Sequence, residues 1–213
     1  MRHLTLIDRV IHEADLALRT LFIPEKRTSH RPSPAKNSIE TTLTLEEKKH
    51  VAGLLRVNHA GEVCAQALYQ GQALTAQLTT IKKQMADAAQ EEIDHLAWCE
   101  ERLGELNAKT SRLNFIWYMG SLMIGLVAGW AGDRISLGFV AETEHQVTQH
   151  LANHLKKVPI NDIKTKAILK QMQADEEGHA LLALQSGGII LPSAIKGLMS
   201  GLSKILTHSS YYV

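Results

Sequence analysis

The sequence predicts an all-α protein built on a four-helix bundle, with additional amphipathic helices toward its N- and C-terminal ends. Aromatic residues make up only 5% of the 213 residues, and the alternation of β-branched side chains that is typical of strands is nearly absent. Apolar residues instead recur at three- and four-residue steps over long stretches that end at Gly or Pro. The sequence also contains two Glu-x-x-His pairs, Glu92/His95 and Glu176/His179. Each pair lies on the expected helix that follows a helix with a lone candidate Glu.

The expected elements follow from these stretches in order. The four helices of the bundle are expected over residues 45–76, 79–104, 134–156 and 161–187, with Asn161 as the N-cap of the last. An amphipathic helix over residues 4–22 and a Pro-rich linker over 23–43 precede them, and an amphipathic helix over 193–207 follows Pro192. We therefore divide the chain into residues 1–43, the N-terminal helix plus linker, and residues 44–213, the di-metal bundle with membrane-associated helices.

The Glu-x-x-His pairs predict a metal site. Residues at i and i+3 share a helix face, so each pair points its carboxylate and imidazole in one direction. Two such pairs and two lone Glu residues are the ligand set of a ferritin-like di-iron or di-manganese bundle. The predicted ligands are Glu62, Glu92, His95, Glu144, Glu176 and His179. Carboxylate and imidazole ligands favour iron or manganese, so we expect two iron ions per subunit, with manganese as the alternative.

The neighbours of each pair separate these candidates from chance matches. Glu92 and Glu176 lie in stripes of Ala, Leu and Met, where an unpaired charge costs several kcal/mol. No run of Lys or Arg shares those faces, so a cation is expected to neutralise them. Two further Glu-x-x-His matches occur, and the pair Glu47/His50 lies in a charged stretch that is typical of a first helical turn.

The remaining match, Glu142/His145, has to be weighed against Glu144. Apolar residues flank Glu144 at helical steps, among them Leu137 and Leu151, whereas mainly Gly and Gln flank Glu142. We therefore expect Glu144 to point into the core and Glu142 to lie on a solvated surface.

The segment 113–132 carries no charged residue and is long enough to span a membrane. A single crossing would separate the two ligand halves by about 30 Å of hydrocarbon, so we expect a buried crossover or a helix lying partly in the membrane interface. Ser121, Gly125 and Gly129 form a strip of small residues that would let another helix approach closely. The apolar face of 193–207 either packs on the bundle or lies on a membrane surface.

Four stretches of the sequence resemble the demethoxyubiquinone hydroxylase family of ubiquinone biosynthesis. They are Arg56-Val-Asn-His-Ala-Gly-Glu62, Gln90-Glu-Glu-Ile-Asp-His-Leu96, Glu142-Thr-Glu-His-Gln-Val-Thr-Gln-His150 and Asp175-Glu-Glu-Gly-His179. The resemblance covers roughly residues 45–207.

This resemblance implies roles for individual residues. One iron would be bound by Glu62, Glu92 and His95. The other would be bound by Glu144, Glu176 and His179, with Glu92 and Glu176 bridging the two ions. His150 and Asn58 are candidates for supporting contacts around the ligands, and Asn58 stands where many members have Asp.

The resemblance also implies a reaction, namely oxygen-dependent hydroxylation of the ring of a polyprenyl methoxy-methyl-benzoquinol. The expected partners are this quinol, O2, a membrane surface and other ubiquinone-biosynthesis proteins, with a homo-oligomeric state and peripheral attachment to the cytoplasmic face of the cell membrane. A net charge of +1 argues against a nucleic-acid partner. Two other functions compete: a ferritin-like iron-storage or peroxide-scavenging protein, and a non-enzymatic lipid-binding bundle.

Overall fold

The computed structural model describes residues 5–22 and 27–213, and these residues form α-helices and no strand. The helices are α1 (Leu6–Leu21), α2 (Leu45–Thr75), α3 (Thr79–Glu105), α4 (Asn114–Trp130), α5 (Asp133–Lys157), α6 (Ile163–Gln185) and α7 (Ser193–Tyr212). The predicted all-α class is confirmed. Leu4 of the predicted first helix and residues 23–26 of the predicted linker lie outside the described residues.

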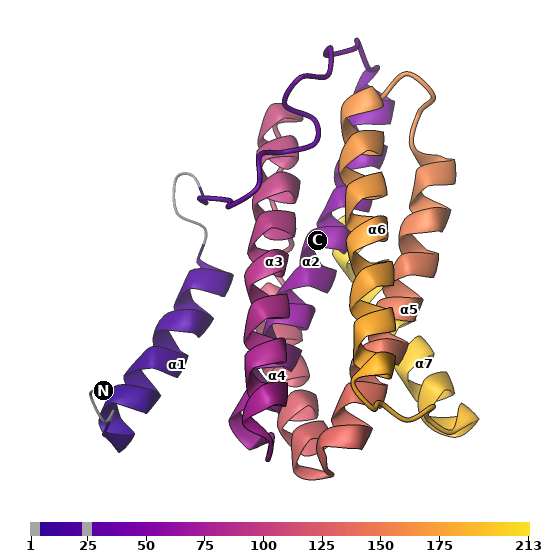
Figure 1. The fold of residues 1–213 in the computed structure, drawn as a ribbon. Coiled ribbons are helices and arrows are strands. Elements are labelled where there is room, and N and C mark those ends of the chain that lie inside the picture. The colour runs from indigo at the N-terminus through magenta and orange to yellow at the C-terminus, as the bar shows by residue number, and fades with distance from the viewer. Residues whose placement is uncertain (1–4, 23–26) are drawn as a thin grey trace.

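The long helices α2, α3, α5 and α6 form the bundle (Figure 1). Its core contains three clusters of apolar side chains, and two of them flank the predicted ligands. One includes Leu55, Trp98 and Leu169, and the other includes Tyr69 and Leu137. Each of these side chains is almost fully buried, and burial of a large apolar side chain contributes about 1.5–3 kcal/mol. Along each long helix, the predicted ligands lie between residues of the two clusters.

Polar side chains fix where two of the four bundle helices, α2 and α6, begin. At the start of α2, Glu47 accepts a hydrogen bond from the backbone N–H of Thr44 at 2.8 Å, and its own N–H donates to the Thr44 hydroxyl at 3.2 Å. Glu47 therefore has the predicted first-turn position. The N-cap of α6 is Asp162 and not Asn161, so that prediction is wrong. The Asp162 carboxylate accepts from the backbone N–H of Thr165 at 3.0 Å, and the Asn161 carbonyl is instead used by Thr41.

Helix α4 packs against α2 through the predicted strip of small residues. A Cβ atom added at Gly125 would collide with the backbone oxygen of Leu68, and one at Gly129 would collide with Thr75. The opposite face of α4 is exposed and carries large apolar side chains such as Phe115. The predicted alternative of a buried crossover is therefore wrong. Within residues 5–22 and 27–213, no helix combines the length and apolar character needed to cross a membrane.

Helix α7 packs against α2 and continues to Tyr212, beyond the end predicted at residue 207. The extension is held by Tyr211, whose hydroxyl lies 2.7 Å from Nδ1 of His50 and whose ring lies against Gly53. Part of the apolar face of α7 nevertheless stays exposed, including Leu198.

Candidate metal centre

Four predicted ligands converge in the middle of the bundle. Glu62 from α2, Glu92 and His95 from α3, and Glu176 from α6 each place one ligand atom within 4.8 Å of all the others. All four side chains are almost fully buried. Helix α3 contributes two of the four ligands because the three-residue spacing in Glu92-Ile-Asp-His95 puts the carboxylate and the imidazole on one helix face.

Glu92 and Glu176 lie between the two imidazoles. Nδ1 of His95 is 2.9 Å from Oε2 of Glu92 and 3.1 Å from Oε1 of Glu176. Nδ1 of His179 is 3.3 Å from Oε1 of Glu92 and 3.1 Å from Oε2 of Glu176. Each of the two carboxylates therefore directs one oxygen toward each histidine, which is the arrangement that a pair of bridging carboxylates needs.

The two lone Glu residues are placed differently. Oε2 of Glu62 lies 3.7 Å from Nδ1 of His95, so Glu62 belongs to the His95 side. Glu144 is buried but lies outside the closest group of four. Its carboxylate accepts a hydrogen bond from the hydroxyl of Tyr69, and the nearby charges of Glu176 and Glu92 help to raise its pKa.

Glu142 is not the solvated surface residue that was predicted. Only 8% of it is exposed, and its carboxylate lies 2.7 Å from Nζ of Lys196 and accepts a hydrogen bond from Gln146 at 2.8 Å. The prediction failed because Lys196 comes from α7, which covers this side of α5. Glu142 pairs with that cation and is separate from the group around Glu92, whereas its neighbour His145 is exposed as expected.

Two acidic residues that were not predicted as site residues orient the imidazoles. Nε2 of His95 lies 2.9 Å from Oδ2 of Asp175, and Nε2 of His179 lies 3.1 Å from Oε2 of Glu91. The pairing is reciprocal, because Asp175 and Glu91 each directly precede the central Glu of the opposite helix. A carboxylate on the second ring nitrogen fixes the tautomer that presents Nδ1 to a metal. The sequence feature that could have identified these two residues is the acidic residue directly before the Glu in both Glu-x-x-His pairs.

Burial and mutual repulsion dominate the electrostatics of the acidic side chains. Burial raises the pKa of Glu62 well above its ordinary value, and the charge of Glu92 acts in the same direction. The pKa of Glu144 is raised by burial and by the charge of Glu176. Burial would also raise the pKa of Glu92, but the charge of His95 and hydrogen bonds from His179 and His95 outweigh it and lower that pKa.

The histidines carry the compensating positive charge. Burial alone would lower the pKa of His95, but the charge of Glu92 and the hydrogen bond with Asp175 raise it well above its ordinary value. Burial opposes the same change at His179, where hydrogen bonds with Glu176 and Glu92 raise the pKa to about 12. In the metal-free centre, protonated imidazoles therefore neutralise the buried carboxylates, for which the sequence predicted a cation.

The donor set fits a metal ion. Oε1 of Glu92 and Oε1 of Glu176 are buried, and in the described part of the chain each has an imidazole Nδ1 nearby, that of His179 at 3.3 Å and that of His95 at 3.1 Å, but no well-aligned hydrogen bond. Buried carboxylate oxygens without such a bond are costly unless a cation binds them. Carboxylate oxygens and imidazole nitrogens are ligands that suit iron and manganese.

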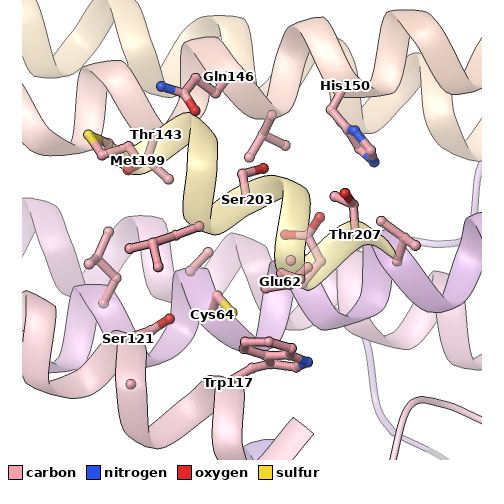
Figure 2. Close-up of a pocket in the computed structure, with 18 of the residues that line it drawn as sticks. Glu62, Cys64, Trp117, Ser121, Thr143, Gln146, His150, Met199, Ser203 and Thr207 are labelled. Atoms are coloured by element: carbon pink, nitrogen blue, oxygen red, sulfur yellow. The ribbon is translucent and has the colours of Figure 1, made fainter. Parts of the chain in front are cut away.

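A cavity of about 350 Å³ lies beside the centre. Helix α7 crosses this cavity, as Figure 2 shows. Glu62 and Glu144 line it, and most of the remaining wall is apolar, formed by α2, α4, α5 and α7. Asn58 and His150 also line the cavity, so the structure puts these two candidates on its wall. Nδ1 of His154 lies 2.9 Å from Oδ1 of Asn58, while Nε2 of His150 is buried without a hydrogen-bond partner among the described residues.

A helical bundle with buried Glu and His side chains from its long helices at the centre belongs to the ferritin-like class of architectures. Residues 49–210 match the sequence model of the family described as "Ubiquinone biosynthesis protein COQ7", and the chain belongs to this family. Two relatives are both named 3-demethoxyubiquinol 3-hydroxylase and align over 100% of both chains. The protein from Legionella pneumophila (strain Paris) is 63% identical, and the one from Acinetobacter baumannii (strain SDF) is 54% identical. The predicted family resemblance is confirmed.

Proposed function

We propose that this chain is an oxygen-dependent hydroxylase of a demethoxyubiquinol, a polyprenyl methoxy-methyl-benzoquinol. The names of its full-length relatives support this reaction. The single observation that carries the proposal is the largely apolar cavity that leads to a buried cluster of carboxylates and imidazoles. A lipid-soluble ring needs the first feature, and oxygen chemistry needs a redox metal at the second.

Six side chains would hold two iron ions. Glu62, Glu92 and His95 would bind one ion, and Glu144, Glu176 and His179 would bind the other. The oxygens that Glu92 and Glu176 direct toward both imidazoles support a bridging role for these two residues. When bound there, iron supplies the two-electron chemistry that activates O2.

The cavity would hold the quinol ring beside Glu62 and Glu144, with the polyprenyl chain along the apolar wall. Burial lowers the pKa of His150 to about 4, with a smaller contribution from Lys157, so this imidazole is neutral at pH 7. A neutral His150 with a free Nε2 can hydrogen-bond a ring hydroxyl without adding a buried charge. One oxygen atom of O2 enters the ring, and the other leaves as water with two electrons and two protons from a reductant.

The test uses purified, iron-loaded protein with a chemical reductant, a demethoxyubiquinol and ¹⁸O2. We expect a product that gains one labelled oxygen atom, detected by mass spectrometry, and no product from Glu176→Ala. If the loaded protein instead accumulates oxidised iron or consumes peroxide without altering the quinol, the storage or scavenging function is correct. If purified protein binds the quinol but no iron, the lipid-binding function is correct.

The exposed apolar faces of α4 and α7 support peripheral attachment to a membrane surface, which we propose is the cytoplasmic face of the cell membrane. Phe115 on α4 is 62% exposed and Leu198 on α7 is 66% exposed, and other residues of both helices line the cavity. A lipid-soluble substrate could then enter without crossing water. Replacing both residues with Glu should release the protein from vesicles of bacterial lipid while metal content stays unchanged. Ile160→Glu, at an even more exposed apolar residue between α5 and α6, should leave sedimentation with vesicles unchanged.

A further inference from the structure

The segment before α2 contacts the surroundings of the metal ligands, although it precedes the residues that match the family. We call residues 27–43 the strap. It runs alongside α3 and over one end of the bundle before α2 begins (Figure 1). Ala35 and Leu43 of the strap are buried in the apolar cluster around Trp98, so the strap is part of the packed structure.

Arg31 of the strap joins α3 to α6. Its Nε lies 2.9 Å from Oδ2 of Asp94 on α3, and its Nη1 lies 2.9 Å from Oδ2 of Asp175 on α6. The backbone around it is anchored as well, because the N–H groups of His30 and Arg31 donate to Asp94 at 2.6 and 3.2 Å. Asp94 is almost fully buried, which makes this attachment rigid.

Trp98 holds Arg31 from the other side. The indole N–H of Trp98 donates to the backbone carbonyl of Arg31 at 3.2 Å, and the guanidinium carbon lies 5.0 Å from the centre of the indole ring. A guanidinium at this distance from an aromatic face is attracted to it. Backbone, ring and two carboxylates therefore restrict Arg31 to one position.

The contact between Arg31 and Asp175 continues to a predicted metal ligand. The oxygen Oδ2 of Asp175 that meets Arg31 also lies 2.9 Å from Nε2 of His95. The other oxygen, Oδ1 of Asp175, accepts a hydrogen bond from the exposed Gln171 at 2.9 Å, and the Asp175 side chain is 12% exposed. Without Arg31 the carboxylate could therefore turn toward Gln171 and water and leave His95 without its partner. A carboxylate that fixes the ring of a metal-binding histidine usually affects metal affinity 10–100-fold.

We propose that Arg31 is a positioning residue for the metal centre, which the strap supplies to hold Asp175 and thereby His95 in its metal-binding orientation. This inference rests on the two-metal site of the proposed function. It assigns to the segment before the family match a role in setting the affinity of the metal position on the His95 side.

The matched control is Arg27 of the same strap. Its guanidinium lies 2.9 Å from Glu100, and both side chains are less exposed than Arg31. This ion pair ties the strap to α3 but contacts no predicted metal ligand. Arg27→Ala therefore removes a comparable strap contact without touching the connection to His95.

The experiment measures binding of Fe(II) or Mn(II) to the full chain by competition with a chelator, together with the melting temperature of the metal-free protein. For Arg31→Ala we expect about tenfold weaker binding of one of two metal equivalents, and unchanged binding of the other. For Arg27→Ala we expect wild-type affinity at both positions, whatever the change in melting temperature.

The outcomes separate this inference from the proposed function. A wild-type chain that binds no metal would contradict the proposed function itself. If the wild type binds two ions and Arg31→Ala binds them equally well, only the role of Arg31 is wrong. Equal weakening by Arg27→Ala would also overturn it, because the strap would then act through general stability. If Arg31→Ala does not fold, the same measurement is made on Arg31→Lys. Lysine keeps the positive charge but lacks the branched guanidinium that reaches both carboxylates. Weaker binding of one equivalent supports the role, and wild-type affinity contradicts it.

Discussion

On α3, His95 is completely buried, and the carboxylate that meets its Nε2, Asp175, is itself held by Arg31. On α6, His179 is 9% exposed, and its corresponding partner Glu91 has a side chain that is 50% exposed. Both histidines come from the same Glu-x-x-His spacing, and both face Glu92 and Glu176. The spacing alone therefore determines which face the ligands share, whereas residues outside the motif determine how firmly each imidazole is held.

The difference predicts unequal metal positions. An ion pair between largely buried groups is held in one geometry, whereas an exposed pair gains little over water. We therefore expect the His95 side to depend strongly on its supporting carboxylate and the His179 side to depend weakly on its own.

The largest effect is expected at a residue that serves both halves. Glu176→Ala removes the carboxylate whose two oxygens lie near both Nδ1 atoms, so both ions should be lost. Metal content per chain after reconstitution checks this. Retention of one full equivalent would show that Glu176 belongs to one half only.

Glu144→Ala should remove one equivalent, because the proposed function assigns Glu144 to the His179 half alone. Its control is Glu142→Ala, which loses the ion pair with Lys196 and should keep both ions. Titration with Fe(II) compares the two variants. Equal binding by both would mean that Glu144 is not a ligand, in keeping with its place outside the closest group of four.

The supporting carboxylates provide the most direct contrast between the halves. We expect Asp175→Asn to weaken one metal position about 10–100-fold and Glu91→Gln to weaken the other by less than about tenfold. Chelator competition on each variant gives the two affinities. Equal losses of affinity in the two variants would contradict the difference between the halves, since the exposure of Glu91 would then have no effect on metal binding.

A pH titration tests the electrostatic basis that the two halves share. The pKa values of His95 and His179 are raised, so both imidazoles hold protons at pH 7, and Glu62 and Glu144 hold theirs to higher pH than an ordinary Glu. Metal binding must displace these protons, so affinity should rise with pH, by about tenfold per pH unit for each proton released. Isothermal titration calorimetry in buffers of different ionisation enthalpy gives the number of protons released on metal binding. Affinity that is independent of pH would contradict the protonated metal-free centre.

The sequence predicted the helices and the grouping of ligands because these depend on local spacing. Apolar periodicity located the long helices within a few residues. The i, i+3 spacing put Glu92 and His95 on one face of α3, and the apolar stripe around Glu176 turned that residue toward the same core. Glu142 was misplaced because its burial depends on Lys196, which α7 brings from a distant part of the chain. The contacts of Arg31 with Asp94 and Asp175 could not be predicted either. The strap has no helical or strand periodicity, and these contacts exist only after α3 and α6 have packed together.

The central claim is that the two halves hold separate ions joined by Glu92 and Glu176. A crystal structure of the iron-loaded protein, with anomalous scattering to locate the metal, tests it most directly. The account predicts two iron peaks, one beside His95 and Glu62 and one beside His179 and Glu144, with both bridging carboxylates bound to each. A single peak among Glu62, Glu92, His95 and Glu176, with Glu144 still hydrogen-bonded to Tyr69 and unbound, would contradict it.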